Sequence, residues 1–142
     1  MANDAAIRQG IRVDLVLATV EAETGGRNIL GDSGNAVGYG QVWPKWHMHS
    51  FKNAALTLGL ADVPLNDIGS LIQYTLDNDA FSMEVTAATI KRFWESSNGD
   101  WGTFTKSYVG PAIPQSDFNR RKAIWDKYRN TNFDYIGAQT GQ

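Results

Sequence analysis

The sequence of 142 residues contains no cysteine. This absence excludes disulfide bonds, thiolate nucleophiles and cysteine-ligated zinc together, and it leaves the redox compartment open. Long hydrophobic runs are absent as well. In the N-terminal stretch MANDAAIRQGIRVDLVLATVE, charged side chains interrupt the apolar residues at Asp4, Arg8, Arg12 and Asp14. We therefore expect no secretory signal peptide and no insertion into a membrane.

The chain also lacks a large excess of charge of one sign. Its net charge is -2 and it has no block of basic residues, so the long-range field that attracts nucleic acid or anionic lipid is missing. We expect neither as a partner. Aromatic residues, in contrast, are abundant: five Trp, five Tyr and six Phe exceed what the core of one small domain usually needs. Some of them are therefore candidates for binding a ligand.

Apolar residues recur at helical spacing, and no strong strand pattern occurs, so we predict a mainly α fold of about six helices. Val13, Val16, Leu17 and Val20 predict one helix over residues 4–23, ended by Gly25 and Gly26. The other predicted helices are a short one around 54–58 that closes at Gly59, two over 68–76 and 83–94, one over 101–109 with Asp100 as N-cap, and a last one that begins at Ser116 or Asp117 and buries Phe118, Ile124, Trp125 and Tyr128.

One domain over residues 1–136 accounts for these elements, and its length suffices to bury roughly two-thirds of the unfolded surface. The last residues, 137–142, read GAQTGQ and are typical of a flexible tail or a truncated linker. Residues 28–46 are the region irregular enough for a small β-hairpin or an ordered loop.

The run GDSGNAVGYGQVWPKWH over residues 31–47 contains four glycines followed by aromatics. A dinucleotide site requires its glycines between a strand and a helix, whereas these follow a helix. A calcium loop requires regularly spaced acids, yet none occurs between Asp32 and Asp62. His47 and His49 would share one side of an extended strand, but no third ligand lies nearby. We expect no metal and no cofactor.

Glu23 stands at the end of the first apolar helix, directly before this run. Partial burial and the negative end of the helix dipole both raise the pKa of a carboxyl group there. A proton retained near neutral pH is what a general acid for glycoside cleavage requires. Glu21 lies about 200° around the helix from Glu23, so only one of the two can face a cleft.

The stretch from Glu23 to Pro44 resembles the signature of the soluble lytic transglycosylases of the lysozyme superfamily. That signature starts with a catalytic Glu followed by Ser, and ends with Gly-Leu-Met-Gln, then Ile or Val, any residue, and Pro. Aligned without a gap, it matches this chain at five positions: Glu23, Gly38, Gln41, Val42 and Pro44. Residues 108–111, Tyr-Val-Gly-Pro, are similar to the family's later Tyr-Asn-Gly-Gly motif. The resemblance covers about residues 10–112.

The resemblance implies a lysozyme-like fold that cleaves the β-1,4 bond between N-acetylmuramic acid and N-acetylglucosamine in peptidoglycan. Glu23 would protonate the leaving oxygen and then, as a base, activate the sugar's own 6-hydroxyl to give a 1,6-anhydro end. The loop over 31–46 would form a floor for the glycan strand, with glycines that let the backbone approach a sugar. The substrate-binding candidates are Tyr39, Gln41, Trp43 and Tyr108, with Trp46 as a further aromatic that could stack on a sugar ring.

Several positions depart from the family pattern: Thr24 replaces Ser, Tyr39 and Gly40 replace Leu and Met, and Val109 replaces Asn. Asp32 stands where the family usually has Ser, nine residues after Glu23. That spacing also occurs in phage lysozymes that hydrolyse with water, so Asp32 is either a turn residue or a second catalytic carboxylate. Three alternatives stay open: a transglycosylase, a hydrolytic muramidase using Glu23 and Asp32, and a non-enzymatic glycan-binding module.

The resemblance and the expected lack of a signal peptide together point to a bacteriophage source. The protein would be either an endolysin released from the host cytoplasm through a membrane lesion or a lytic domain carried on the virion within a larger protein. In both cases the expected partner is the glycan strand of the cell wall.

Overall fold

The computed structural model describes residues 1–131, so the predicted tail over 137–142 lies outside the described residues. The described part is mainly helical, with one small antiparallel sheet, as predicted. In chain order its elements are α1 (Ala2–Gln9), α2 (Val13–Thr24), β1 (Leu30–Gly31), the short 3-10 helix η1 (Asp32–Gly34), β2 (Ala36–Val37), α3 (Pro44–Leu58), α4 (Ile68–Asp77), α5 (Asp79–Ser96), α6 (Trp101–Val109) and α7 (Gln115–Arg129).

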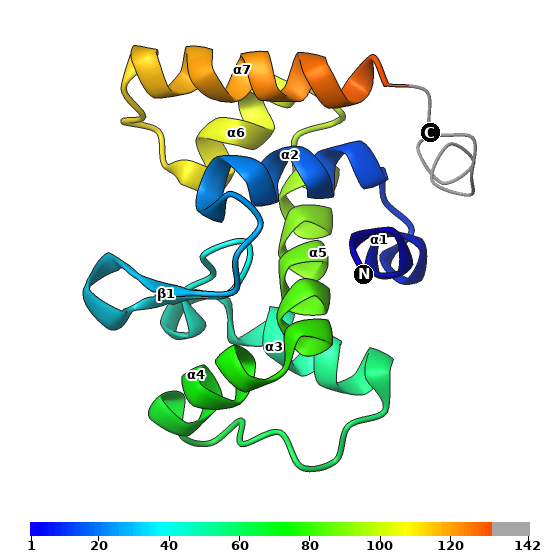
Figure 1. Cartoon of the computed structure of the whole chain (residues 1–142), viewed down its shortest axis with the longest axis vertical. Helices are drawn as coiled ribbons and strands as arrows, with labels where there is room; N and C mark the ends of the chain where they lie inside the picture. The colour runs from blue at the N-terminus through cyan, green and yellow to red at the C-terminus, as the bar shows by residue number, and fades with distance from the viewer. Residues whose placement is uncertain (132–142) are drawn as a thin grey trace.

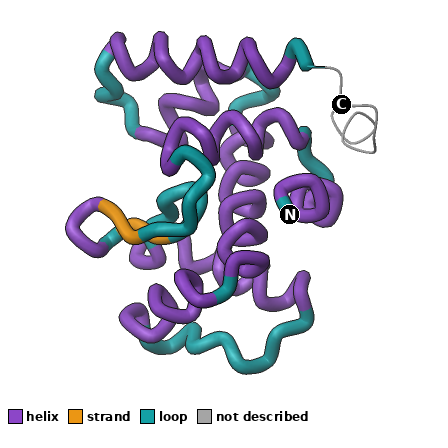
Figure 2. Tube along the Cα trace, viewed as in Figure 1, coloured by secondary structure: helices purple, strands orange, loops and turns teal. Residues whose placement is uncertain are grey.

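Helix α5 is the centre of the arrangement (Figure 1), and every residue from Phe81 to Ile90 is buried. At one end of α5 lie α2, α6 and α7, and at the other end lie α3 and α4. Two apolar clusters correspond to these ends. One contains Val16, Ile90 and Trp125, and the other contains Phe51, Leu71 and Phe81. The β1–β2 hairpin projects between the two ends (Figure 2).

The predicted single helix over 4–23 is wrong, because the chain forms two helices there. Gly10 adopts a left-handed conformation with φ 67°, and its N–H bonds back to the carbonyl groups at the end of α1. The chain then turns, and α2 starts at Val13. A single glycine that caps a helix interrupts the backbone without interrupting the apolar spacing, which is why the periodicity concealed the break.

Helix α3 is longer than the predicted helix around 54–58, because it already begins at Pro44, a residue well suited to the first helical turn. His47 and His49 therefore lie on a helix and not on a strand. Gly59 ends this helix with φ 66°, as predicted. Asp100 caps α6 by accepting a hydrogen bond from the backbone N–H of Thr103, as predicted.

The last helix begins at Gln115, one residue before the predicted start. Trp125 is buried, as predicted, whereas Phe118, Ile124 and Tyr128 are only half-buried.

A buried ion pair fixes α1 on α5. The side chain of Glu84 is fully buried, and its two carboxylate oxygens accept from Arg8 Nε and from Gln9 Nε2, each at 2.7 Å. Both oxygens of this acid are thus satisfied by α1, so Glu84 serves the fold. None of the helices in the described part of the chain is long and apolar enough to cross a membrane.

Candidate active site

The last turn of α2 delivers Glu23 to a cleft. The helix ends at Thr24, whose hydroxyl group donates hydrogen bonds to the carbonyl oxygens of Val20 and Tyr39 at 3.2 and 3.0 Å. The bond to Tyr39 ties the end of α2 to the loop after β2. Gly25 then leaves the helix with φ 64°. The side chain of Glu23 is 15% exposed and points to the cleft instead of to bulk solvent.

The cleft and the solvent-open space at its mouth together have a volume of about 790 Å³. The cleft brings together five of the six residues predicted for the site: Glu23, Asp32, Gln41, Trp43 and Tyr108. The remaining lining residues among those described are Val42, His47, Thr89, Phe93, Val109 and Arg121. Together, the lining residues come from α2, the hairpin region, α3, α5, α6 and α7, so elements from both ends of the molecule form the cleft.

Burial raises the pKa of the Glu23 carboxyl group above its usual value, and the negative charges of Asp117 and Asp32 act in the same direction. Arg121 opposes them, because its Nη1 lies 2.8 Å from Glu23 Oε2. The burial effect is the largest of these and prevails. The arrangement favours a carboxylic acid that keeps its proton at higher pH than an ordinary Glu does.

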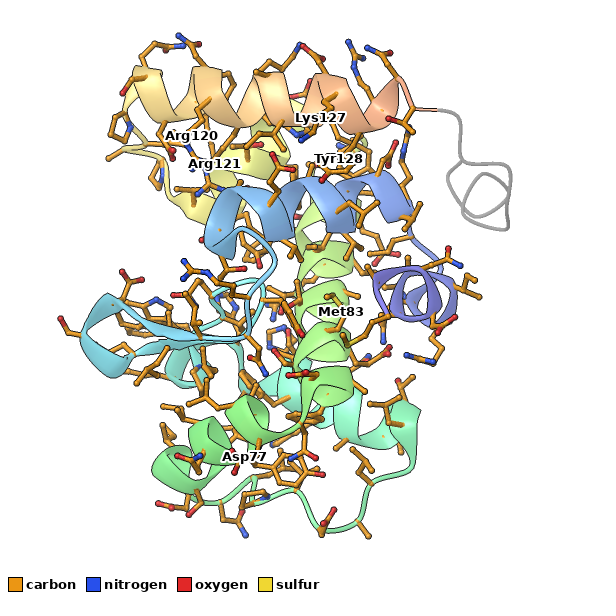
Figure 3. All side chains as sticks on the ribbon, in the orientation of Figure 1. Asp77, Met83, Arg120, Arg121, Lys127 and Tyr128 are labelled. Carbon is orange, nitrogen blue, oxygen red and sulfur yellow. The ribbon has the colours of Figure 1, made fainter. Side chains whose placement is uncertain are left out.

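Glu21 occupies the opposite side of the same helical turn. Its Oε1 accepts from Lys127 Nζ at 2.7 Å and from the Tyr128 hydroxyl group at 2.6 Å. These two donors lower the pKa of Glu21. Figure 3 shows Lys127 and Tyr128 toward the end of α7 and Arg120 and Arg121 toward its start, all beside α2. Glu23 lines this cleft and Glu21 does not, in agreement with the expectation that the two acids face different sides of the helix.

Asp32 lines the cleft at the tip of the hairpin, where its backbone has φ 49°. Its Oδ2 accepts from Trp43 Nε1 at 3.2 Å, and its carbonyl oxygen accepts from the backbone and side-chain N–H groups of Asn35. Asp32 therefore forms a turn, as one of the two interpretations predicts. Asp32 also lines the same cleft as Glu23, which the second interpretation requires.

Tyr39 does not reach the cleft, which corrects its prediction as a sugar-binding residue. It is only 7% exposed and belongs to the apolar cluster around α5. Burial raises the pKa of its hydroxyl group, and the negative charge of Asp79 adds to this effect. A buried ring in this position offers no open face on which a sugar could stack. Trp46, in contrast, is 63% exposed, but it lies outside the lining of the cleft.

Gln41 contributes to the shape of the loop. Its side-chain amide donates to the carbonyl oxygens of Ile29 and Gly38 at 2.9 and 3.0 Å, so both N–H groups are used within the hairpin region. Its backbone has φ 53°, a conformation that these bonds help to hold. The predicted reading of acetamido groups by these N–H groups would require breaking both hydrogen bonds, and the amide oxygen packs against Gly31, where a Cβ atom would overlap it.

Two of the four glycines of the run, Gly38 and Gly40, bring the loop close to other parts of the protein and not to a sugar, which corrects the role predicted for them. A Cβ atom at Gly38 would overlap Ser82, and one at Gly40 would lie 2.6 Å from the hydroxyl oxygen of Tyr108 and overlap Thr86. Both glycines thus allow the loop to pack against α5 and α6. The sequence could not distinguish this close approach from the approach of a ligand.

Tyr108 and Val109 are the lining residues that come from α6, and the pKa of Tyr108 responds to the charge of Glu23. The hydroxyl group of Tyr108 donates to the Gly40 carbonyl oxygen at 2.8 Å, which joins α6 to the loop. Burial raises its pKa well above the usual value, and the charge of Glu23 raises it further. The hydroxyl group therefore stays protonated and is engaged with the protein.

His47 lines the cleft, a position that the sequence did not indicate, because its spacing from His49 is typical of a pair of metal ligands. Its backbone leaves helical geometry within α3 (φ −129°, ψ 36°), and its ring meets Phe93 edge-on at 5.5 Å between centroids. Nδ1 is buried without a hydrogen-bond partner. Burial lowers the pKa of His47, and His49 and Arg92 lower it further, so the ring is neutral near pH 7. His47 lines the cleft, and Nε2 is the ring nitrogen that is not among the buried atoms without a partner.

His47 is also distinctive among the neutral donors of the described cleft. Trp43 donates to Asp32, Gln41 to Ile29 and Gly38, Thr89 to the Val85 carbonyl oxygen and Tyr108 to Gly40. A neutral imidazole that carries its proton on Nε2 leaves an acceptor, rather than a donor, unpaired inside the protein. This tautomer presents an N–H group to the cleft for a ligand.

Like Thr89 and Phe93, Arg121 is a lining residue that the sequence did not indicate. It follows Asp117 by four residues, a spacing typical of a helix-surface ion pair, and nothing in that pattern indicates Glu23 as a further partner. Within residues 1–131, no group of three or more His, Asp or Glu side chains has the geometry to hold a metal ion.

Comparisons with models of known protein families, with curated proteins and with solved structures found no match. The cleft therefore has to be interpreted from its own chemistry.

Proposed function

We propose that this protein is a peptidoglycan lytic transglycosylase with a lysozyme-like fold. It cleaves the β-1,4 bond between N-acetylmuramic acid and N-acetylglucosamine, and Glu23 is its catalytic acid and base. The observation that carries this proposal is a carboxyl group with a raised pKa, 15% exposed, on the wall of a polar cleft whose volume, with the solvent-open space at its mouth, is about 790 Å³. This combination is typical of a general acid in a glycan-cleaving site.

The chemistry needs one carboxyl group. Protonated Glu23 donates its proton to the glycosidic oxygen while the bond from that oxygen to C1 of the muramic residue breaks. The resulting carboxylate then takes the proton from the 6-hydroxyl group of the same residue, and O6 bonds to C1. Glu23 ends protonated, no water is consumed, and the product carries a 1,6-anhydro ring. Arg121 lies close enough to stabilise the carboxylate between the two steps.

Recognition of the glycan rests on the walls that face Glu23. His47 offers an uncommitted N–H group, and an acetamido carbonyl oxygen or a sugar hydroxyl group is the acceptor that a neutral donor suits. Phe93 and Trp43 add apolar surface, and the hydrogen bond from Trp43 Nε1 to Asp32 helps to orient the indole ring. Sugar rings carry polar hydroxyl groups at their edges and apolar C–H groups on their faces. The cleft offers both polar and aromatic side chains, which suits such a ligand.

Hydrolysis is the second candidate, because Asp32 and Glu23 line the same cleft and Asp32 helps to raise the pKa of Glu23. In an inverting hydrolase Asp32 would activate a water molecule. We favour the transglycosylase because Asp32 already accepts from Trp43 and shapes the hairpin turn, which accounts for its presence without a catalytic role.

The test is the release of soluble fragments from purified peptidoglycan by the wild type, Glu23→Gln and Glu21→Gln, with folding checked by circular dichroism. We expect the loss of Glu23 to reduce release on the order of 10²–10⁴-fold, and Glu21→Gln to leave it nearly unchanged. Equal release by the two variants would refute the assignment of Glu23. Glycan binding without any release would indicate a binding module.

A further inference from the structure

Arg121 does not belong to Glu23 alone. Its Nη1 lies 2.8 Å from Glu23 Oε2, and its Nε lies 2.9 Å from Asp117 Oδ2, one turn earlier on α7. The side chain is 12% exposed, so solvent screens these charges little. One guanidinium group is thus divided between two carboxylates.

Asp117 is fixed from the other side as well. Arg120 donates to Asp117 Oδ1 through Nε and Nη2, at 3.0 and 2.9 Å. The same Nη2 donates to the carbonyl oxygen of Ala22 at 3.1 Å. The start of α7 therefore bonds to the last turn of α2 at two points, the backbone of Ala22 and the side chain of Glu23. Figure 3 shows both arginines on the part of α7 beside α2.

We propose that Asp117 is a positioning residue that shares Arg121 with Glu23, so that Arg121 orients the Glu23 carboxyl group without fixing it as a carboxylate. A lone arginine beside Glu23 would favour the ionised form and remove the proton that cleavage needs. A buried glutamic acid with no arginine would keep its proton but would release it reluctantly. When the guanidinium group is divided between two acids, it favours the ionised form of Glu23 less than a lone arginine would. Glu23 can then both keep its proton and release it.

The groups that face Glu23 from the neighbouring elements are consistent with this balance. Asp117 and Arg121 come from α7, Asp32 from η1 and Tyr108 from α6, and His47 lines the same cleft from α3. Tyr108 and His47 are neutral near pH 7. Arg121 is thus the cation that acts on Glu23, and Asp117 is the acid bonded directly to that cation.

This inference rests on the proposed role of Glu23, but the coupling can be measured without any activity. The full chain, labelled with ¹³C at glutamate side chains, is titrated by NMR as wild type, Asp117→Asn, Arg121→Gln and Asp126→Asn. Asp126 is the matched control, because it forms ion pairs with Lys122 and Arg129 on the same helix and is not among the groups acting on Glu23.

We expect Asp117→Asn to lower the pH at which Glu23 titrates, because the negative charge of Asp117 no longer raises the pKa of Glu23 and Arg121 then acts on Glu23 alone. Arg121→Gln should raise it, and Asp126→Asn should leave it unchanged. Asp117→Glu, which keeps the charge, should restore the wild-type value if the asparagine variant is poorly folded. Shifts in the same direction for Asp117→Asn and Arg121→Gln, or equal shifts for Asp117→Asn and Asp126→Asn, would overturn the proposal.

The rate of fragment release provides the second readout. In Asp117→Asn the fall in rate at high pH should begin at lower pH, so that the ratio of activity at pH 8 to activity at pH 5 drops about 3- to 10-fold. A purely structural role for Asp117 would lower the rate at both pH values equally and contradict the proposal. If the wild type releases no fragments, the proposed function fails, and the titration alone still decides whether Asp117 controls Glu23.

Discussion

The two faces of the last turn of α2 carry the same side chain in opposite environments. Glu21 meets Lys127 and Tyr128 at the surface, and these donors lower its pKa. Glu23, two residues later, enters the cleft, where burial raises its pKa although Arg121 is close. The difference shows that burial outweighs the partner in setting the direction of the pKa shift: at the more exposed Glu21 the two donors lower the pKa, whereas at the more buried Glu23 the cation offsets only part of the cost of burial.

The largest effect is expected when the side chain of Glu23 is shortened. Glu23→Asp withdraws the carboxyl group by one methylene from the cleft and from Arg121. We expect a reduction in peptidoglycan cleavage of about 100-fold, because a displacement of about 1 Å disrupts proton transfer. Glu21→Asp is the control on the opposite face and should change the rate less than about twofold. A rate for Glu23→Asp within a few-fold of the wild type would show that the reach of this carboxyl group is unimportant.

The proposed contact of His47 with the glycan is tested by His47→Phe, which keeps a ring against Phe93 but removes the ring N–H group. We expect KM for soluble glycan fragments to rise about 10-fold, with a smaller effect on kcat, because one hydrogen bond to the ligand is lost. His49→Phe is the matched change two residues away, outside the lining of the cleft. Similar KM values for both variants would exclude His47 as a glycan contact.

Asp32 distinguishes the two chemistries of the cleft. If Glu23 acts alone, Asp32→Ser should retain activity within about threefold, since only the bond to Trp43 and the turn are disturbed. A second catalytic carboxylate would instead cost on the order of 100-fold or more. Steady-state rates of fragment release measure this difference, and a loss of that size in a folded variant would favour the hydrolase.

The smallest expected effect concerns stability and has opposite signs on the two faces of α2. The folded state raises the pKa of Glu23, so its contribution to stability is present below the unfolded pKa and is lost as pH rises through the folded pKa. Glu23→Gln should therefore raise Tm by about 2–4 °C near pH 7.5 and by less near pH 4.

For Glu21 the signs are reversed. The folded state lowers its pKa, so its contribution is present above the unfolded pKa and is lost as pH falls through the folded pKa. Glu21→Gln should lower Tm near pH 7.5 by less than about 3 °C, because the side chain is 35% exposed and solvent screens its pair with Lys127. Calorimetric scans at the two pH values check both variants. Equal changes in Tm for Glu21→Gln and Glu23→Gln would contradict the comparison.

The sequence predicted the class of fold because most of its helices carry a local signal. Apolar spacing revealed α4 to α7, and Asp100 and Gly59 marked helix ends through their own side-chain or backbone chemistry. The break at Gly10 was missed because a glycine cap leaves that spacing intact. The start of α3 was missed because polar and aromatic residues after Pro44 conceal its apolar face.

The candidate site was predictable only where neighbours in sequence are neighbours in space. Glu23, Asp32 and Trp43 come from one stretch, and the structure places them in one cleft. Arg121 reaches Glu23 from the last helix, a contact without any local signal. Tyr39 was misplaced because the sequence does not show which side of the loop faces α5, where packing buries its ring.

The measurement that tests the central claim most directly is mass spectrometry of the fragments released from peptidoglycan by the wild type, with Glu23→Gln as the inactive control. The account predicts fragments that are lighter by one water molecule than hydrolysis products, with no reducible muramic end, and none from Glu23→Gln. Reducible ends would show that water attacks the sugar, and Asp32 would then be assigned a catalytic role in addition to its role in the turn. Fragments of either kind from folded Glu23→Gln would contradict the account itself.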